Sequence, residues 1–467
     1  MRYKGSFKGK DVVVFGLGSS GRAAAQVLIG LGARVSVVDQ GESPDLREHA
    51  ESLRQIGARC YLGMAPAEVM RSAKMVVVSP GVPTAIEPLE QARKAGASVI
   101  GELELSFMLS DADFLAITGT KGKSTTTRLL HRILAVAGFD VVAGGNLPDE
   151  PLCGKVMRLL SGAAVVAEVS SFQLETIVTF RPRVACITNL GVDHLDRYSS
   201  LEEYHAAKLR IFENQEASDV LVLNAGDARL VELARGVARS VVWFGMGTPD
   251  KLDGVFLTSE EIICVREGKS SPVLKRKDIT LPGLHNLENV MAAAAMAIAR
   301  RVPVDAIREA LDGFKLAPHT LEVFAMFEGI TFVDDSHATN TLAVTKALEA
   351  FEGPIILIAG GRDKGCDWAE ILEAARGKIK TVIAIGEASS RIAAALGKDL
   401  PVLLNVGGVA DIVAQAASLA ASGDVVLLSP GCSSFDMFKD FRDRGNRFKK
   451  AVLDYLEGRG HGVSQVR

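Results

Sequence analysis

The sequence predicts an α/β protein with three domains and mostly parallel β-sheets. Short β-branched runs alternate with longer stretches rich in Ala and Leu, which is the pattern of βαβ units around a parallel sheet. The chain has 467 residues, and at roughly 150 residues per domain this length indicates about three domains. Glycine is frequent, with 45 residues against 16 prolines, which fits tight strand-to-helix turns better than extended linkers.

The predicted strands form three series along the chain. Each run is short and rich in β-branched residues, as expected of a strand that is buried on both faces. Three series agree with the number of domains that the length indicates. The first series contains Val12–Phe15, Val35–Val38 and Val76–Val78; the second contains Leu115–Thr118, Ala163–Glu168, Val184–Asn189 and Val220–Leu223; the third contains Ile330–Asp334, Ile355–Ala359, Thr381–Ile385 and Val425–Leu428.

Two further elements stand apart from these series. The turn-rich stretch Trp243–Asp278 predicts a small antiparallel sheet that decorates the middle domain. Near the end of the chain, roughly Asp436–Leu456 predicts a helix with one apolar stripe and with Lys and Arg outward. The residues of this stripe are Phe438, Phe441, Phe448 and Val452.

Two boundaries divide the predicted domains. One lies near Asp111, after the sequence Gly101-Glu102-Leu103-Glu104, and the other lies near Pro318. We therefore expect domains of residues 1–111, 112–317 and 318–467.

Composition and charge narrow the classes of function. Lys and Arg total 53 and Asp and Glu total 56, for a formal net charge of -3, which argues against a protein that holds nucleic acid by bulk charge. The six cysteines lie far apart with no C-x-x-C pair, which indicates reduced thiols rather than a zinc site or a disulfide framework. No run approaches the roughly 18 apolar residues of a membrane span. We expect a cytoplasmic protein that binds neither nucleic acid nor membrane.

A glycine-rich turn follows the first predicted strand. Its sequence is Gly16-Leu17-Gly18-Ser19-Ser20-Gly21, and such glycines let the backbone approach a phosphate at a helix N-terminus. Asp39 ends the second strand at about the spacing of a ribose-binding acid. By itself the turn fits an NAD site, a site for another nucleotide, or a helix that simply packs on a strand.

A second glycine-rich turn is more typical of phosphate binding. The sequence Thr118-Gly119-Thr120-Lys121-Gly122-Lys123-Ser124-Thr125-Thr126 follows a predicted strand. In such a loop backbone N–H groups surround the phosphates, Lys123 meets them as a point charge and Ser124 can reach Mg²⁺. The spacing between Gly119 and Gly122 is shorter than the strict motif requires. The alternative, a glycine turn with a surface lysine, is disfavoured by the strand before it and the hydroxyls after it.

Polar residues follow later strands of the second series. Glu168 ends a buried strand, where a carboxylate opens toward the ligand crevice of such sheets and can supply an oxygen to Mg²⁺. Its alternative role is that of a helix N-cap acid. Within Asn189–Asp196, His194 lies among carboxylates and can ligate a metal, hold a phosphate or act as a base. Lys208, on a predicted helix, has by itself the pattern of a solvated helix face.

Together these motifs resemble those of the Mur ligase family, the ATP-dependent amide-forming enzymes of peptidoglycan synthesis, over nearly the whole chain. The motifs near the C-terminus are more specific than the glycine turns. They most resemble the D-glutamate-adding member of the family, as does Ser79–Pro83. The signatures are Thr118–Thr126, Glu168–Leu174, Asn189–Asp196, Leu284–Asn289, Asp334–Asn340, Gly360–Gly365 and Leu428–Asp436, with Phe438, Phe441 and Arg444-Gly445.

The resemblance implies a Rossmann-like first domain for a UDP-linked substrate, a central P-loop-type ATPase domain with a mostly parallel sheet, and a Rossmann-like third domain for an amino acid. It implies that ATP phosphorylates the carboxylate of UDP-N-acetylmuramoyl-L-alanine and that D-glutamate then attacks the acyl phosphate. ATP and two Mg²⁺ ions would serve this reaction, and the enzyme would be a monomer. The alternative within the family is a ligase that adds a different amino acid, such as L-glutamate.

The resemblance also implies roles for individual residues. Lys123, Glu168, His194 and Lys208 would be catalytic, and Lys208 would carry a carbamate that supports the second Mg²⁺. The implied ATP-binding residues are Gly119, Thr120, Lys121, Gly122, Lys123, Ser124, Thr125, Asn286, Asn289 and Asp335; those for the UDP-linked substrate are Gly18, Ser19, Gln40, Gly81, Asn146 and His194; those for the amino acid are Lys364, Thr339, Ser434, Phe441 and His337; and those for metal are Ser124, Glu168, His194 and carbamylated Lys208.

Several positions depart from the family pattern. His337 replaces a usual Lys, so a fixed cation becomes one that titrates near neutral pH. Thr320 replaces a usual Arg, and Lys121 replaces a usual Asn. Asn146 is followed by Leu-Pro rather than by Ile-Gly. These departures motivate two alternatives, a ligase for another amino acid and a binding protein that has lost catalysis. An NAD-dependent oxidoreductase has only the first glycine turn and Asp39 in its favour.

Overall fold

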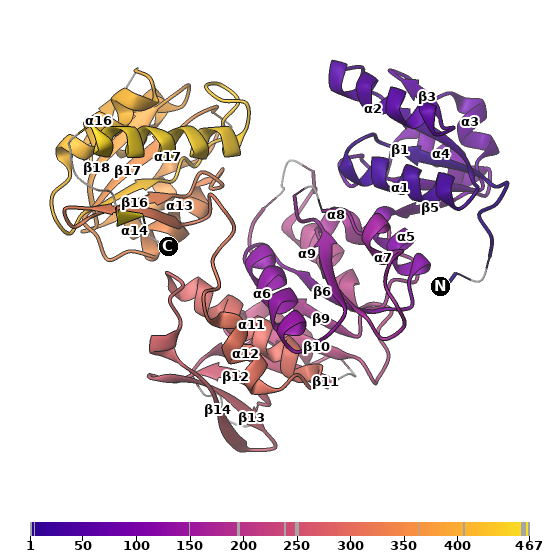
Figure 1. The fold of residues 1–467 in the computed structure, drawn as a ribbon, viewed down its shortest axis with the longest axis horizontal. Helices are drawn as coiled ribbons and strands as arrows, with labels where there is room; N and C mark the ends of the chain where they lie inside the picture. Colours follow the sequence, from indigo (N-terminus) through magenta and orange to yellow (C-terminus); the bar gives the residue numbers. More distant parts are fainter. Residues whose placement is uncertain are drawn as a thin grey trace. The chain divides into compact units, whose positions relative to one another are not determined.

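The chain divides into two compact units, one of Met1–Ile279 with Glu288–Phe314 and the other of Thr280–Leu287 with Lys315–Arg467. The computed structural model describes residues 2–3, 5–148, 150–193, 197–237, 240–247, 252–363, 365–404, 407–458 and 464–465. The first unit contains two β-sheets and the second contains one (Figure 1). Most neighbouring strands are parallel and helices alternate with them, so the predicted α/β fold class is confirmed.

The first sheet is wholly parallel, with the strand order β3-β2-β1-β4-β5. The side chains of alternate residues of β1 point to opposite faces of the sheet. Val12 and Val14 pack with residues of α1 and α2, and Val13 and Phe15 pack with residues of α3 and α4. Burial on both faces explains why the strand is apolar almost throughout. The elements are β1 (Asp11–Phe15), α1 (Ser19–Gly30), β2 (Arg34–Asp39), α2 (Pro44–Gln55), β3 (Arg59–Leu62), α3 (Ala67–Ser72), β4 (Met75–Val78), α4 (Glu87–Lys94) and β5 (Ser98–Gly101).

The second sheet follows α5 (Glu102–Leu109), a helix whose residues are nearly all buried. Its order is β14-β13-β12-β11-β10-β9-β6-β8-β7. The strands from β7 to β11 are parallel to their neighbours. The strands are β6 (Asp113–Thr118), β7 (Val141–Gly145), β8 (Ala164–Glu168), β9 (Val184–Ile187), β10 (Val220–Asn224), β11 (Ser240–Met246), β12 (Gly254–Leu257), β13 (Glu261–Arg266) and β14 (Lys269–Lys275). The helices are α6 (Lys123–Val136), α7 (Cys153–Val156), α8 (Ser171–Leu174), α9 (Leu201–Leu209), α10 (Ala228–Ala234), α11 (Leu284–Ala299) and α12 (Val304–Leu311), with short 3₁₀ turns at Arg210–Phe212 and Arg276–Asp278.

The stretch Trp243–Asp278 is predicted to form a small antiparallel sheet that decorates the middle domain. Strand β13 is antiparallel to both β12 and β14, as expected. However, β12 pairs in parallel with β11, so these strands extend the central sheet. An edge strand presents unpaired backbone N–H and C=O groups, and pairing β11 with β12 satisfies them.

The second unit is built on a sheet with the order β19-β18-β17-β20-β16-β15-β21. Strand β15 is antiparallel to β16 and β21, and the other neighbours are parallel. In β17, Ile356 and Ile358 pack with α16 and α17, whereas Leu357 and Ala359 pack with α13 and α15 on the opposite face. The strands are β15 (Glu322–Phe327), β16 (Ile330–Asp334), β17 (Ile355–Gly360), β18 (Ile379–Ile385), β19 (Val402–Leu404), β20 (Val425–Leu428) and β21 (Ser464–Gln465). The helices are α13 (Thr341–Glu349), α14 (Leu372–Ala375), α15 (Ser389–Leu396), α16 (Val409–Leu419) and α17 (Phe441–Glu457), with a 3₁₀ turn at Trp368–Ile371.

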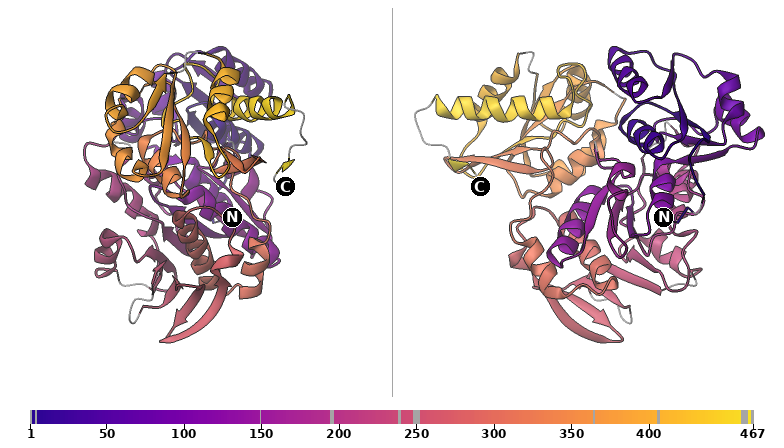
Figure 2. Two further views of the ribbon diagram at one scale, coloured as in Figure 1. Left: turned by 90° about the vertical axis from the view of Figure 1, so that its left-hand side faces the viewer. Right: turned by 45° about the vertical axis from the view of Figure 1, so that its right-hand side comes forward.

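The last long helix, α17, begins later than predicted. Asp440 is its N-cap, because the carboxylate accepts the N–H of Asp443 at 2.8 Å. Phe438 therefore lies before the helix, which Figure 2 shows along one face of the third sheet. Phe448 and Val452 are buried as expected. Arg444 is only 1% exposed, so the expectation that every basic residue of this helix faces outward is wrong.

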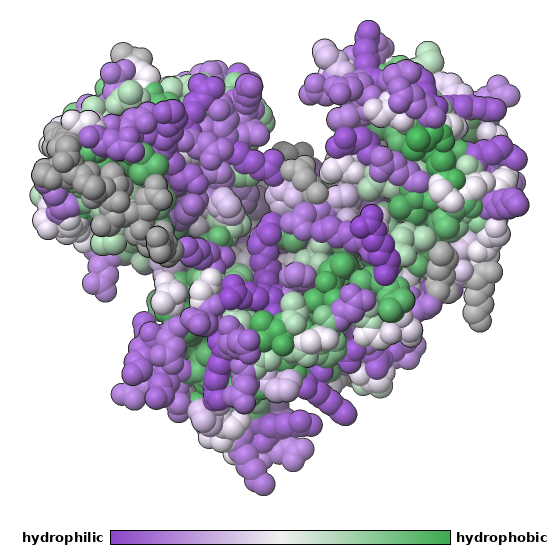
Figure 3. All heavy atoms as spheres, viewed as in Figure 1, coloured by the Kyte–Doolittle hydropathy of each residue, from purple (hydrophilic) through white to green (hydrophobic). Residues whose placement is uncertain are grey.

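Hydrophilic side chains cover most of the face of the molecule drawn in Figure 3, with hydrophobic residues gathered in patches between them. Among the residues that the structure describes, no helix has both the length and the apolar character needed to cross a bilayer.

Candidate active site

The predicted phosphate loop connects β6 to α6 in the first unit. Gly119 and Gly122 have φ angles of +143° and +84°, a region that L side chains rarely adopt. A Cβ at Gly119 would lie 1.9 Å from Oγ1 of Thr188, and a Cβ at Gly122 would lie 2.2 Å from Oδ1 of Asn289. Both positions therefore require glycine, for backbone conformation and for space.

The segment after β9 holds this loop in shape. Oγ1 of Thr188 donates to the carbonyl of Lys121 at 2.6 Å. The side-chain amide of Asn189 accepts the N–H of Lys121 at 2.9 Å and donates to its carbonyl at 3.1 Å. The N–H of Gly191 donates to Oγ1 of Thr120 at 2.9 Å. The sequence patterns give Thr188 and Asn189 no role in shaping the loop, and the only signal for one is their position after a strand that neighbours β6.

Two lysine amines meet at one carbonyl of the phosphate loop. Nζ of Lys123 donates to the carbonyls of Gly119 at 3.0 Å and Thr120 at 3.1 Å. Nζ of Lys208 donates to the same Gly119 carbonyl at 2.9 Å. Lys208 is 2% exposed, so the interpretation of this residue as part of a solvated helix face is wrong.

Burial lowers the pKa of both amines. Desolvation, with the nearby charge of Lys123, lowers the pKa of Lys208 to about 6. Desolvation also lowers the pKa of Lys123, an effect that the carboxylates of Glu168 and Asp193 oppose. At neutral pH Lys208 is therefore mostly a neutral amine, which is nucleophilic.

Glu168 ends β8, the strand next to β6. Its Oε1 accepts the side-chain amide of Asn146 at 2.7 Å. Its Oε2 is buried and has no hydrogen-bond partner among the described residues. The alternative of a helix-capping acid is excluded, because Ser170 caps α8 in a capping box with Gln173. A buried carboxylate oxygen without a donor is a favourable ligand for a cation.

The other residues predicted to bind ATP are divided between the two units. Ser124 and Thr125 begin α6, and Asn289 of α11 lies beside them, with its Oδ1 3.5 Å from Oγ1 of Thr126. In the second unit, the amide of Asn286 donates to the carbonyl of Pro282 at 2.7 Å.

Asp335 is buried in the second unit, and burial raises its pKa to about 7. Its carboxylate accepts the N–H of Leu321 at 3.1 Å and the hydroxyl of Ser429 at 2.8 Å. Asp335 is the residue predicted to contact the ribose, and its carboxyl group already joins three segments of the second unit.

Most residues predicted for the UDP-linked substrate lie at one edge of the first sheet. Gly18 and Ser19 follow β1, Gln40 follows β2 and Gly81 follows β4. These three strands are neighbours and the strand order reverses between β1 and β4, which is where ligands of such sheets bind. Asn146 lies instead beside Glu168, after β7.

Asp39, the residue that the NAD alternative assigns to a ribose, has a structural function. Its two carboxylate oxygens accept the N–H groups of Leu17 and Gly41 at 2.7 and 2.8 Å. It therefore braces the turns after β1 and β2, and its position at the end of a strand is explained without a dinucleotide.

The residues predicted for the amino acid lie in the second unit. The ring centroids of His337 and Phe441 are 4.9 Å apart, so the structure brings these two together. Ser434 is 2% exposed, and Thr339 is half-buried before α13.

Arg444 joins the segments that carry these residues, and only a signature motif pointed to it in the sequence. Its guanidinium donates to the hydroxyl and the carbonyl of Ser336, both at 2.9 Å, and to the carbonyl of Cys432 at 3.1 Å. The hydroxyl of Ser336 in turn donates to the carbonyl of Phe441 at 2.8 Å.

An ionic network of two buried and two partly exposed side chains lies beside Arg444 in the second unit. Nδ1 of His319 is 2.6 Å from Oδ2 of Asp334, and Nζ of Lys449 is 2.9 Å from Glu322 and 3.8 Å from Asp334. His319, Glu322 and Asp334 are close enough to share a cation. The ammonium of Lys449 pairs with Glu322 and lies near Asp334, so a cation of the protein itself already contacts this cluster. Two other predicted site residues, His194 and Lys364, lie outside the described residues.

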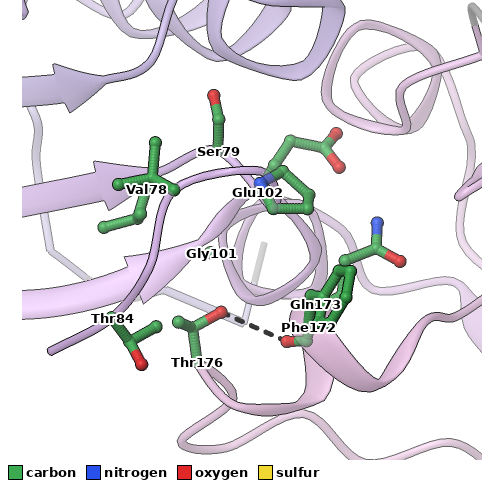
Figure 4. Close-up of a pocket in the computed structure, with 10 residues that line it drawn as sticks. Val78, Ser79, Thr84, Gly101, Glu102, Phe172, Gln173 and Thr176 are labelled. Atoms are coloured by element: carbon green, nitrogen blue, oxygen red, sulfur yellow. Dashed lines mark hydrogen bonds between the residues drawn. The ribbon is translucent and has the colours of Figure 1, made fainter. Parts of the chain in front are cut away.

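A small pocket in the first unit separates the loop after β4 from α8 and the residues that follow it (Figure 4). Beside it, the guanidinium of Arg197 and the carboxylate of Glu175 form an ion pair at 3.0 Å. The sequence patterns assign neither residue a function. The lining residues are Val78, Ser79, Pro80, Val82, Thr84, Gly101, Glu102, Phe172, Gln173 and Thr176.

Three family models match successive parts of the chain. The Mur ligase MurD-like N-terminal domain matches residues 10–101, the Mur ligase middle domain matches residues 117–297, and the Mur ligase glutamate ligase domain matches residues 321–432. Among solved structures, MurF from Acinetobacter baumannii superimposes with a TM-score of 0.61 over 91% of this chain and 90% of that one. At 16% identity this likeness concerns the fold alone.

Curated relatives match the chain almost from end to end. The UDP-N-acetylmuramoylalanine--D-glutamate ligase of Pelotomaculum thermopropionicum is 40% identical over 97% of this chain and 99% of its own length. The enzyme of the same name from Myxococcus xanthus is 41% identical over 96% of this chain and 99% of its own length. These matches confirm the resemblance inferred from the motifs, and the chain belongs to the Mur ligase family.

Proposed function

We propose that the protein ligates D-glutamate to UDP-N-acetylmuramoyl-L-alanine, with ATP as the phosphate donor, in peptidoglycan precursor synthesis. The names and nearly full-length similarity of its relatives support this reaction over the addition of L-glutamate. The geometric observation that carries the proposal is the meeting of Lys123 and Lys208 at the Gly119 carbonyl, beside the buried carboxylate of Glu168.

The reaction needs activation because a carboxylate is a poor acyl donor. A phosphoryl group moves from ATP to the carboxylate of the UDP-linked substrate, and the amine of D-glutamate then displaces phosphate to leave an amide. Phosphoryl transfer depends mainly on positioning and on neutralising charge. In this chain the glycines of the phosphate loop present backbone N–H groups, and Lys123 supplies the positive charge at the transferred phosphate.

The residues around Glu168 fit Mg²⁺. This hard cation prefers oxygen ligands, and Oε2 of Glu168 is buried with no donor among the residues that the structure describes. Ser124, at the start of α6, offers a hydroxyl beside the loop. Glu168, Ser124, His194 and a carbamate on Lys208 would hold the metal, which would neutralise phosphate charge during transfer.

Substrate binding is proposed by domain. Residues 1–111 would bind the UDP-linked substrate through the turns after β1, β2 and β4, residues 112–317 would bind ATP, and residues 318–467 would bind D-glutamate. Within the third domain, Lys364 and the hydroxyls of Thr339 and Ser434 would take the carboxylates of the amino acid. Phe441 and His337 would form an adjoining wall.

A phosphate-release assay over a panel of amino acids tests the proposed function. We expect release from ATP only when UDP-N-acetylmuramoyl-L-alanine and D-glutamate are both present, because the acyl phosphate needs its carboxylate and its amine. Release with L-glutamate but not with the D-enantiomer would contradict the assignment of the amino acid. ATP binding without turnover under any combination would identify a protein that has lost catalysis.

The pKa of Lys208 leads to a second expected result. Above about pH 6 the amine is free to react with CO₂, forming an N–C bond and releasing one proton to give a carbamate; below that pH it is protonated and cannot. Turnover should therefore rise as the pH increases through about 6, and added bicarbonate should stimulate it near that pH. Arginine cannot form the carbamate, so Lys208→Arg should be inactive at every pH.

Carbon-13 NMR with labelled bicarbonate provides the direct measurement. A carbamate carbon signal is expected on the wild-type protein and should be missing from Lys208→Arg. Equal signals in both proteins, or full activity of the arginine variant, would contradict the carbamate.

A further inference from the structure

The carboxylate of Glu175 is a junction between three chain segments of the first unit. Its Oε2 accepts the hydroxyl of Thr84 at 3.2 Å and Nη2 of Arg197 at 3.0 Å. Its Oε1 accepts the hydroxyl of Tyr198 at 2.6 Å. Thr84 follows β4, Glu175 is the C-cap of α8, and Arg197 and Tyr198 precede α9. One side chain thus links the loop after β4 to two segments beside the second sheet.

Arg197 strengthens the same link through three further contacts. Its guanidinium donates to the carbonyls of Pro80 at 3.2 Å and Val82 at 3.5 Å. It also lies 4.0 Å from the ring centroid of Phe172, at the distance of a cation–π contact. Phe172 and Thr84 line the pocket of Figure 4 from its two sides. The loop Ser79–Thr84 is therefore fixed at Pro80, Val82 and Thr84.

The ion pair is shielded from solvent. The side chains of Arg197 and Glu175 are each 19% exposed. Removing one charge of such a pair leaves the other poorly solvated, which costs more than the loss of an exposed pair. Burial and the hydrogen bond to Glu175 raise the pKa of Tyr198, so its hydroxyl remains a donor.

Each joined segment carries residues of the proposed site. Gly81 lies in the middle of the fixed loop and is assigned to the UDP-linked substrate. Helix α8 begins just after Glu168, the proposed metal ligand. Arg197 immediately follows the motif Asn189–Asp196, whose first residue shapes the phosphate loop. A change in the Glu175 junction would thus alter the spacing between the substrate loop and the phosphate-transfer residues.

We propose that Glu175 is a positioning residue that holds the substrate loop Ser79–Thr84 at a fixed distance from the phosphate-transfer residues, with Arg197 as its main partner. The inference rests on the proposed function, because it assigns the loop to the UDP-linked substrate. Since that substrate must contact both sides of the junction, a loosened junction weakens its binding. ATP and D-glutamate have no assigned contact with this loop.

The test compares Glu175→Gln with the wild-type protein. Glutamine keeps the shape of the side chain but loses its charge and one of its acceptors. We expect the KM for UDP-N-acetylmuramoyl-L-alanine to rise about tenfold, while kcat and the KM values for ATP and D-glutamate stay within about twofold. Calorimetric titration with the UDP-linked substrate alone should show the same loss of affinity without turnover.

Two milder variants test the same junction if Glu175→Gln fails to fold, and a third variant is a matched control. Thr84→Val and Tyr198→Phe each remove a single hydrogen bond to Glu175, and each should raise the same KM about threefold. Glu232→Gln removes the carboxylate of an exposed pair with Arg235, the C-cap of α10 (Ala228–Ala234), and should change none of the kinetic constants.

The outcomes separate the two proposals. Unchanged affinity in Glu175→Gln, or a fall in kcat with no change in this KM, would overturn the positioning role. An equal rise in all three KM values would indicate general loosening and would also overturn it. A wild-type protein that fails to bind the UDP-linked substrate would instead overturn the proposed function, and the inference with it.

Discussion

Replacing Lys123 with alanine should lower kcat for phosphate release by about 1,000-fold. The amine of Lys123 donates hydrogen bonds to the Gly119 and Thr120 carbonyls. In the proposed function it would meet the negative charge of the transferred phosphoryl group. The fold should survive, because the Gly119 carbonyl keeps its hydrogen bond from Lys208 and the partners of the Lys123 amine among the described residues are backbone carbonyls. Steady-state phosphate release with all three substrates saturating measures the effect.

Lys450→Ala is the matched control for this experiment. Lys450 is 75% exposed on α17 and pairs with Asp454 on the same helix, so turnover should be unchanged. Turnover of Lys123→Ala within tenfold of the wild type, with unchanged thermal unfolding, would show that the loop does not bind the phosphate that is transferred.

Replacing Glu168 with glutamine should lower turnover by about 100-fold at a fixed Mg²⁺ concentration. Glutamine preserves the shape of the side chain, and its oxygen can still accept the amide of Asn146. What is lost is the negative charge on the buried oxygen, for which the described part of the chain offers no donor. A titration of initial rate against Mg²⁺ should therefore show half-activation at a higher metal concentration, with partial recovery of rate at high Mg²⁺.

Glu349→Gln is a suitable control, because this carboxylate is half-exposed and pairs only with Lys346 on the same helix among the pairs the structure describes. Its Mg²⁺ titration should coincide with that of the wild type. Coincident titrations for Glu168→Gln would remove this residue from the metal site and would leave its buried oxygen without an explanation.

The fold class was readable from the sequence because strands buried on both faces leave a strong local signal. Every predicted run, from Val12–Phe15 to Val425–Leu428, lies within or overlaps a strand of the structure. Strands whose composition is less typical of β-structure were not predicted. Strand β7 ends in two glycines, and β3 has no β-branched residue. Both form strands despite this low β-propensity because they pair with neighbouring strands.

Side-chain environment was much less predictable than strand position. Lys208 has a sequence context suited to a solvated face, yet the structure buries it against the phosphate loop. Arg444 lies among charged residues of α17 and was expected to face outward, yet it bonds to Ser336 and Cys432. Both errors arise because helical periodicity does not report what packs against the helix.

By itself the sequence determined the α/β class, the series of parallel strands, the glycine turn between β6 and α6 and the membership in the Mur ligase family. These features depend on local composition, glycine conformation and short motifs, each of which is specified by residues that are consecutive in the sequence. The tertiary structure alone decided that Lys123 and Lys208 share a carbonyl, that Oε2 of Glu168 is buried with no donor within the described ranges, and that Glu175 joins three segments. Those properties depend on distances and desolvation between residues far apart in the chain, and only the packing of strands and helices sets them.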